Sequence, residues 1–132
     1  MLRKEDFDHE FAQSDWNAAK EEARAIMIKR AKSRNTISYS ELVSQIRSIR
    51  LDPHDARLDH FLGQISSEED SKGLGMLTVL VVHKSGDLEP GKGFYELAHS
   101  LGRDISDREK CWAEELQRVY EVWSDRPVNF TD

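Results

Sequence analysis

Nucleic-acid recognition is the chemistry most directly suggested by one flank of a helix predicted over residues 53–66. At 100° per residue, the exposed side chains of this flank are Arg57, His60 and Gln64. Arginine and glutamine hydrogen-bond to base edges in the major groove of DNA. The opposite flank is acidic and carries Asp52, Asp55 and Asp59. Arg57 therefore has two interpretations, a nucleic-acid contact or a surface ion pair with Asp55 or Asp59.

Metal, cofactor and thiol chemistry are not predicted. None of the five histidines stands three or four residues from another, and there is no pair of cysteines, so the sequence contains no zinc motif. The single cysteine, Cys111, adjoins Trp112 in a helical pattern, with no helix N-terminus or fixed base beside it to activate the thiol. We therefore predict no catalytic residue, no metal ligand and no cofactor, and we do not expect an enzyme.

The segment Gly91-Lys92-Gly93 precedes a short helix predicted over residues 94–101. Backbone amides and a lysine at a helix N-terminus can hold an anion. The segment lacks the spacing of a phosphate-binding loop and follows no clear strand, so a tight turn is the alternative interpretation. The spacing favours the turn.

Length and composition indicate a single domain over residues 1–132. Hydrophobic residues make up 38% of the chain and charged residues 33%, which is typical of a globular protein with a well-solvated surface. The first residues are charged and lack the apolar stretch of a secretory signal, and no apolar run approaches the length of a membrane span. These features predict a cytoplasmic protein that does not enter a membrane.

Positive charge is concentrated in residues 20–50. This segment holds eight basic and three acidic residues, whereas the whole chain has a formal net charge of −6. Such asymmetry can give an acidic protein one positive face; solvated helix faces without functional meaning are the alternative. Tyr39, Arg47 and Arg50 lie in this segment, shortly before Arg57, and we predict that all four contact nucleic acid.

Helices near both ends of the chain are predicted from apolar residues at helical spacing. The first is expected over residues 14–33, begins at Ser14 or Asp15, and has an apolar stripe formed by Trp16, Ala19, Ala23, Ile26 and Met27. The last is expected over residues 106–124, begins with a capping box formed by Ser106 and Glu109, and buries Trp112, Leu116, Val119, Tyr120 and Trp123.

Two further helices are predicted between them. The first begins with a Ser38–Glu41 capping box and buries Leu42, Val43, Ile46 and Ile49. In the next, Asp52 is expected to be the cap and Pro53 the first helical residue. Its core face consists of Leu58, Phe61, Leu62 and Ile65. Residues 66–75 are expected to form a loop with at most one helical turn, solubilised by Glu68, Glu69 and Asp70.

Residues 76–83 form the strongest predicted strand, because a nearly continuous apolar run indicates burial on both faces. Turn residues at 84–87 and a weak returning edge over residues 88–93 would complete a hairpin. The order of elements predicts an α+β, mostly helical fold. It would have a winged-helix-like three-helix core with a small β-hairpin, over about residues 36–95, and flanking N- and C-terminal helices.

Three motifs within residues 36–95 resemble the C-terminal domain of the alkylguanine-DNA alkyltransferases. They are Ile37-Ser38-Tyr39-Ser40-Glu41-Leu42, Ala56-Arg57-Leu58 and Val81-Val82-His83-Lys84-Ser85-Gly86. The first is similar to the opening of that family's helix-turn-helix. The resemblance implies that Tyr39 works against a DNA phosphate and that Arg57 enters the base stack as a nucleotide is flipped.

The reactive Pro-Cys-His-Arg of that family is absent from this sequence. Counting back from Gly86 places Thr78 at the position of the cysteine. Thr78 has neither a thiol nor an adjacent base to activate it, so we do not expect alkyl transfer. The segments Leu-Asp-Pro-His-Asp (residues 51–55) and Pro-Gly-Lys-Gly-Phe (residues 90–94) also resemble a set of small bacterial proteins, and that resemblance implies no activity.

We therefore expect a non-enzymatic, winged-helix-like binding domain whose preferred ligand is duplex DNA. The residues expected to contact DNA are Tyr39, Arg47, Arg50, Arg57, His60 and Gln64. The alternative is a protein–protein interaction module of the immunity or adaptor type, without nucleic acid. The acidic total charge favours this alternative, whereas the basic segment and the motif resemblance favour DNA.

Overall fold

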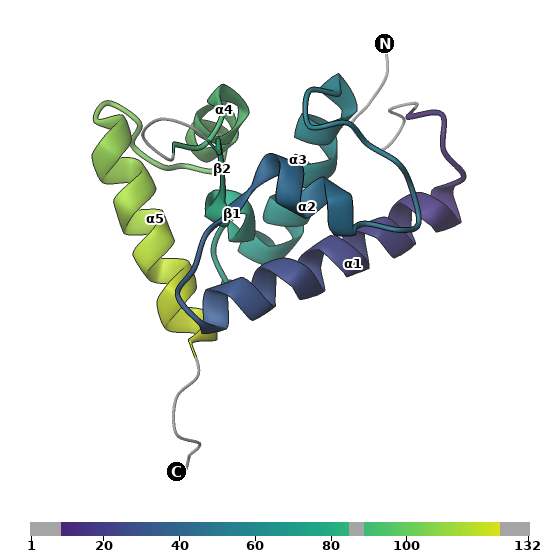
Figure 1. The fold of residues 1–132 in the computed structure, drawn as a ribbon. Helices are drawn as coiled ribbons and strands as arrows, with labels where there is room; N and C mark the ends of the chain where they lie inside the picture. The colour runs from purple at the N-terminus through teal and green to yellow at the C-terminus, as the bar shows by residue number, and fades with distance from the viewer. Residues whose placement is uncertain (1–8, 85–88, 125–132) are drawn as a thin grey trace.

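The computed structural model describes residues 9–84 and 89–124, which form a mostly helical α+β fold (Figure 1). The α-helices of this part are α1 (Gln13–Lys32), α2 (Tyr39–Gln45), α3 (Ala56–Ser71), α4 (Lys92–Ser100) and α5 (Arg108–Trp123). The other elements are the strands β1 (Ile37–Ser38) and β2 (Val81–Val82) and the 3-10 helix η2 (Leu77–Leu80). The predicted mostly helical α+β class is confirmed.

The core is centred on η2, which contacts α1, α3 and α5. Met76, Leu77, Val79 and Leu80 are completely buried. Figure 1 shows α1 extended along one edge of the molecule, with α5 meeting its C-terminal end. Because helices surround η2, all four of its side chains are buried, and Thr78 is the one polar residue among them.

The strand predicted over residues 76–83 is wrong for its first half, because residues 77–80 form η2. Val81 and Val82 do form a strand, and they pair in parallel with Ile37 and Ser38. A short apolar run is typical of both a buried strand and a buried helical turn, so periodicity did not separate them. Residues 85–88, where most of the predicted turn falls, lie outside the described residues. The returning edge predicted over residues 88–93 is wrong for its described part, because residues 89–91 form no strand and Lys92 begins α4.

Helix α3 begins later than predicted. Asp55, and not Asp52, caps its N-terminus, because its carboxylate accepts a hydrogen bond from the backbone N–H of Arg57 at 2.9 Å. Pro53 therefore lies before the helix. The predicted core face is confirmed, since Leu58, Phe61, Leu62 and Ile65 are buried.

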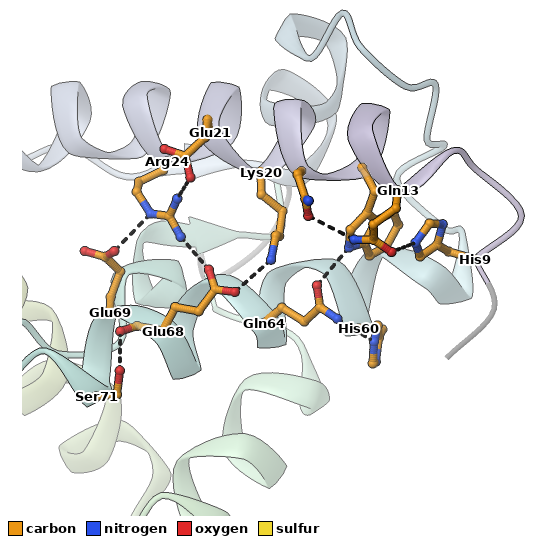
Figure 2. A network of polar contacts seen from close by, with 12 residues as sticks. His9, Gln13, Lys20, Glu21, Arg24, His60, Gln64, Glu68, Glu69 and Ser71 are labelled. Atoms are coloured by element: carbon orange, nitrogen blue, oxygen red, sulfur yellow. Dashed lines mark hydrogen bonds and ion pairs between the residues drawn. The ribbon is translucent and has the colours of Figure 1, made fainter. Parts of the chain in front are cut away.

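Helix α3 also ends later than predicted, because its last turns pack against α1 through ion pairs. Glu68 accepts hydrogen bonds from Lys20 and Arg24 at 2.7 Å each (Figure 2). Arg24 also donates to Glu69, which is buried, at 2.9 Å. The loop predicted over residues 66–75 is therefore wrong up to Ser71, and these carboxylates join two helices instead of only solubilising the chain.

The capping box predicted for α2 is confirmed. The backbone N–H of Glu41 donates to Ser38 Oγ at 3.1 Å, and the N–H of Ser38 donates to Glu41 Oε1 at 3.3 Å. The helix is shorter than predicted and ends at Gln45. Ile46 and Ile49 are buried as predicted, but they lie in the irregular segment that leads to α3.

The flanking helices predicted over residues 14–33 and 106–124 are present as α1 and α5, with different caps. The N-cap of α1 is Ala12, which makes no side-chain hydrogen bond. Asp107 caps α5 by accepting from the N–H of Lys110 at 3.1 Å, in place of the predicted Ser106. The sequence therefore identified these helices better than their first residues.

Candidate functional site

A cleft opens where the N-terminus of α4 approaches the start of α2 and the first turns of α3. Its outer lobe has a volume of about 590 Å³ and its lining includes His54, Asp55, His83, Lys84 and Lys92. Its inner lobe has a volume of about 460 Å³ and its lining includes His60, Leu62, Gly63, Thr78, Phe94 and Leu97. Both lobes are lined by Tyr39, Asp59 and Glu96, so they adjoin.

Tyr39 stands at the junction of the two lobes. The capping box and the pairing of β1 hold its backbone at the first position of α2. Its hydroxyl accepts a hydrogen bond from the N–H of Gly91 at 2.8 Å, and its ring centroid lies 5.1 Å from that of His83. Burial raises the pKa of Tyr39, and the Asp59 carboxylate adds to this effect. The hydroxyl therefore keeps its proton at neutral pH.

Two glycines allow residues 90–94 to cross the cleft close to its other walls. A Cβ on Gly91 would lie 2.8 Å from the hydroxyl oxygen of Tyr39, and a Cβ on Gly93 would lie 3.2 Å from the carboxyl group of Asp59. Helix α4 begins between them, at Lys92, two residues before the predicted start. The close approach explains both glycines as packing requirements of the cleft wall.

The charges that line the cleft are mixed. Lys84 and Lys92 are exposed, and neither forms an ion pair within the described residues. Three carboxylates share the lining, those of Asp55, Asp59 and Glu96. An anionic ligand would therefore be attracted by two lysines and repelled by nearby carboxylates.

The structure brings together two of the six residues predicted to contact nucleic acid. Tyr39 lines both lobes and His60 lines the inner lobe. Arg47 and Arg50 are exposed in the segment between α2 and α3, and they line neither lobe. The backbone N–H of Arg47 donates to Glu22 Oε1 at 3.0 Å, which fastens this segment to α1.

The positive face predicted over residues 20–50 is divided by local contacts. Lys20 and Arg24 are engaged with the carboxylates of α3. Arg30 donates to the carbonyl of Thr36 at 2.7 Å. The basic residues of this segment therefore do not form one continuous free surface.

Arg57 is held by its own helix cap and by the first described residues. Its Nε and Nη2 donate to the carboxylate of Asp55 at 3.0 and 2.6 Å, and its Nη1 donates to the carbonyl of His9 at 2.9 Å. The guanidinium lies 4.6 Å from the centroid of the Phe11 ring. Of the two interpretations of Arg57, the structure contains the ion pair with Asp55.

Gln64 links α1 to α3. The indole N–H of Trp16 donates to Gln64 Oε1 at 2.8 Å. Gln64 Nε2 lies 3.0 Å from His60 Nε2 (Figure 2). The ring of His9 stacks on Trp16 with 3.9 Å between centroids. Both ends of the Gln64 amide are thus engaged within the protein.

The pair formed by Asp55 and Arg57 predicts a stability that depends on pH. Hydrogen bonds from Arg57 hold the pKa of Asp55 below its ordinary value. The folded state therefore binds this proton less tightly than the unfolded state, whose aspartate pKa is about 4. The pair stabilises the fold above that pH, and its contribution is lost as the pH falls through the lower folded pKa. We expect Asp55→Asn to lower the melting temperature by a few degrees at neutral pH and to leave it unchanged in strong acid.

Thermal unfolding followed by circular dichroism at the two pH values checks this prediction. Asp52→Asn is the matched control, because Asp52 is exposed and its carboxylate accepts from the backbone of His54, without an arginine partner. An equal decrease in melting temperature for Asp55→Asn at both pH values would contradict the prediction.

Several residues of the cleft were not predicted as contacts from the sequence. Three of them are His83, Lys84 and Lys92, which line the outer lobe. The N–H of His83 donates to the carbonyl of Glu89 at 2.8 Å. The available signal was the pair of glycines around Lys92, which we interpreted as a tight turn. Asp59 was interpreted as a possible ion-pair partner of Arg57 and not as a wall of a binding site.

Within residues 9–84 and 89–124, no group of three or more His, Cys, Asp or Glu side chains is placed to hold a metal ion. In the same residues, no helix has both the length and the apolar character that crossing a bilayer requires. The chain matches no protein-family model, no curated protein and no solved structure. The candidate site is therefore defined by its geometry.

Proposed function

We propose that this protein is a non-enzymatic, winged-helix-like binding domain that holds DNA at the cleft. The observation that carries the proposal is the meeting of the Tyr39 ring with two exposed lysines, Lys84 and Lys92, on one concave surface. Lysines bind phosphates, and the resemblance to alkyltransferases implies that Tyr39 also works against a phosphate. The contacts with DNA then come from the cleft, and not from Arg57.

The winged-helix-like part of the proposal is supported by the order of elements within residues 36–95. Two consecutive helices, α2 and α3, carry a small sheet formed by β1 and β2. This sheet is parallel, whereas the wing of a winged helix is an antiparallel hairpin. We therefore propose a variant in which the sheet joins the helices together and the cleft carries the contacts.

The resemblance to alkyltransferases supports the choice of DNA as ligand. Thr78, which the resemblance places at the position of that family's cysteine, lines the inner lobe, as Tyr39 does. We propose the absence of enzymatic activity for two reasons: Thr78 stands in place of the reactive cysteine, and the one thiol of the chain, that of Cys111, is buried. Cys111 is 5% exposed and burial raises the pKa of its thiol, which disfavours the reactive thiolate.

A salt titration of a fluorescently labelled DNA duplex tests the proposal. We expect weak binding that is lost as salt rises, because the chain carries a net charge of −6 and carboxylates line the cleft. The double variant Lys84→Ala/Lys92→Ala should reduce the slope of log affinity against log salt by about 2, since each lost phosphate contact reduces it by about 1.

Two control variants remove the same charge elsewhere. Lys29→Ala/Lys32→Ala changes exposed residues of α1, and Arg47→Ala/Arg50→Ala changes the surface predicted from the sequence. We expect both to alter the slope less than the cleft variant. Equal effects of the three variants would indicate general electrostatic attraction and contradict a site at the cleft.

A protein-interaction module is the second candidate function. The carboxylates of Asp55, Asp59 and Glu96 on the same lining favour it, because they repel phosphates and suit a partner with basic side chains. Failure of DNA to bind even at low salt would overturn the first proposal and leave this one in its place.

A further inference from the structure

Two buried hydroxyl groups meet at the inner lobe of the cleft. Ser66 of α3 is 0% exposed and Thr78 of η2 is 6% exposed. Their Oγ atoms lie 2.5 Å apart, and the backbone N–H of Thr78 donates to Ser66 Oγ at 3.1 Å. Thr78 lines the inner lobe, whereas Ser66 lies behind it.

The hydrogen bond between these hydroxyls has a preferred direction. The other helical serines with a hydroxyl bond to the backbone donate to a carbonyl of the preceding turn: Ser44 to Glu41, Ser71 to Glu68 and Ser100 to Leu97. Ser66 makes no such bond within the described residues, so Thr78 Oγ1 is the acceptor available to its proton. A buried hydroxyl without an acceptor is costly, so Ser66 donates to Thr78.

This direction leaves the proton of the Thr78 hydroxyl without an acceptor among the described residues. The open space that Thr78 borders is the inner lobe. Since buried polar groups are almost always hydrogen-bonded, the acceptor for this proton must be supplied by what occupies the lobe.

The walls of the inner lobe restrict the kind of group that can enter. Leu62, Phe94 and Leu97 make the walls apolar, and Asp59 and Glu96 add negative charge to the lining. An anion would be repelled by these carboxylates, and a cation, which they would attract, brings no acceptor for the proton of Thr78. An uncharged group of apolar or aromatic character fits these walls.

We infer that the inner lobe binds an uncharged group that carries a hydrogen-bond acceptor, and that the Thr78 hydroxyl donates to this acceptor. This inference rests on the proposed function in using the same cleft as a binding site, and it adds the chemistry by which one lobe selects its ligand. Thr78 is then a specificity-determining residue at the inner end of the cleft.

Acetophenone and ethylbenzene are suitable probes, because they share a carbon skeleton and only acetophenone has a carbonyl acceptor. Titration of the full chain with each compound, followed by amide NMR spectra, should perturb the signals of residues that line the inner lobe. Thr78→Val should lower the affinity for acetophenone by about fivefold, which is the effect of one hydrogen bond, and leave the affinity for ethylbenzene unchanged. Thr78→Ser, which keeps the hydroxyl, should restore acetophenone binding.

Gly63→Val gives an independent test, because Thr78→Val also removes the acceptor of Ser66 and so lowers stability. A Cβ on Gly63 would meet Leu97 Cδ2 at 4.0 Å, with no other atom outside its own helix backbone and chain neighbours within that distance, so a Cβ there makes only an ordinary van der Waals contact. A valine side chain at this position would extend from the wall of the inner lobe, which Gly63 lines. We expect Gly63→Val to keep the fold and to abolish the binding of both compounds.

Two results would overturn the inference. One is the absence of any perturbation of inner-lobe signals in the unmodified chain. The other is an equal loss of affinity for the two compounds in Thr78→Val. Neither depends on DNA, so acetophenone binding as expected without DNA binding would leave the inference standing and overturn the DNA proposal.

Discussion

Glu115→Ala is expected to lower the free energy of unfolding by about 3–5 kcal/mol, the effect of removing one partner of a buried ion pair. Glu115 is 3% exposed and accepts hydrogen bonds from Arg103 Nε and Nη2, both at 2.9 Å. It also accepts from the backbone N–H of Met76 at 2.8 Å. Arg103 extends the network to Asp70 at 2.6 Å, so one carboxylate joins α3, α5 and the segment before η2.

Urea unfolding followed by circular dichroism measures this loss. Glu114→Ala is the matched control, because Glu114 is the exposed neighbour on the same helix, and its substitution should change the free energy of unfolding by less than about 0.5 kcal/mol. A loss for Glu115→Ala as small as that of the control would show that the network contributes little.

Trp16→Ala is the second substitution with a large expected effect, also about 3–5 kcal/mol, because it opens a cavity in the core. Trp16 is completely buried and packs edge-on against Phe61, with 5.1 Å between ring centroids. Its loss also removes the stacking partner of His9 and the donor to Gln64. The contacts that join α1 to α3 near the first described residues would be lost together.

Trp16→Phe separates packing from hydrogen bonding, since it keeps an aromatic ring and removes the indole N–H. We expect it to cost less than Trp16→Ala, and circular dichroism is the suitable probe because tryptophan fluorescence changes with the substitution itself. Equal losses for the two variants would mean that the bond to Gln64, and not the filling of the core, dominates the contribution of Trp16.

The helices were predictable because their patterns are local. The apolar stripe that begins at Trp16 predicted α1, and the Ser38–Glu41 capping box predicted the start of α2 to the residue. The core face of α3 followed from the spacing of Leu58, Phe61 and their neighbours. Each of these features depends on residues within about one turn of each other, so no knowledge of the tertiary structure was needed.

The elements that were predicted wrongly depend on distant partners. Glu68 and Glu69 continue α3 because Lys20 and Arg24 of α1 face them, and nothing near them in the sequence indicates this. The segment 76–83 is mostly apolar because three helices enclose η2. Such an apolar pattern does not favour a strand over a 3-10 helix. In both cases tertiary contacts, and not local propensity, decided the outcome.

The candidate site was predictable only in part for the same reason. Tyr39 and His60 could be proposed from their own chemistry, and both line the cleft. Arg57 had the right chemistry, but Asp55 and the carbonyl of His9 hold it in another environment. Lys92 joins the cleft because the backbone on either side approaches Tyr39 and Asp59, a geometry that the sequence indicates only through its glycines.

The parallel pairing of β1 with β2 constrains the order in which the chain can fold. Ile37 pairs with Val81, so α2, α3 and η2 all lie in the loop that this pairing closes. Two residues per strand provide too few hydrogen bonds to offset the entropy of closing so long a loop in an unfolded chain. The helices must therefore pack first, which makes the sheet a late event in folding. During synthesis, β1 would remain unpaired until α3 and η2 had left the ribosome.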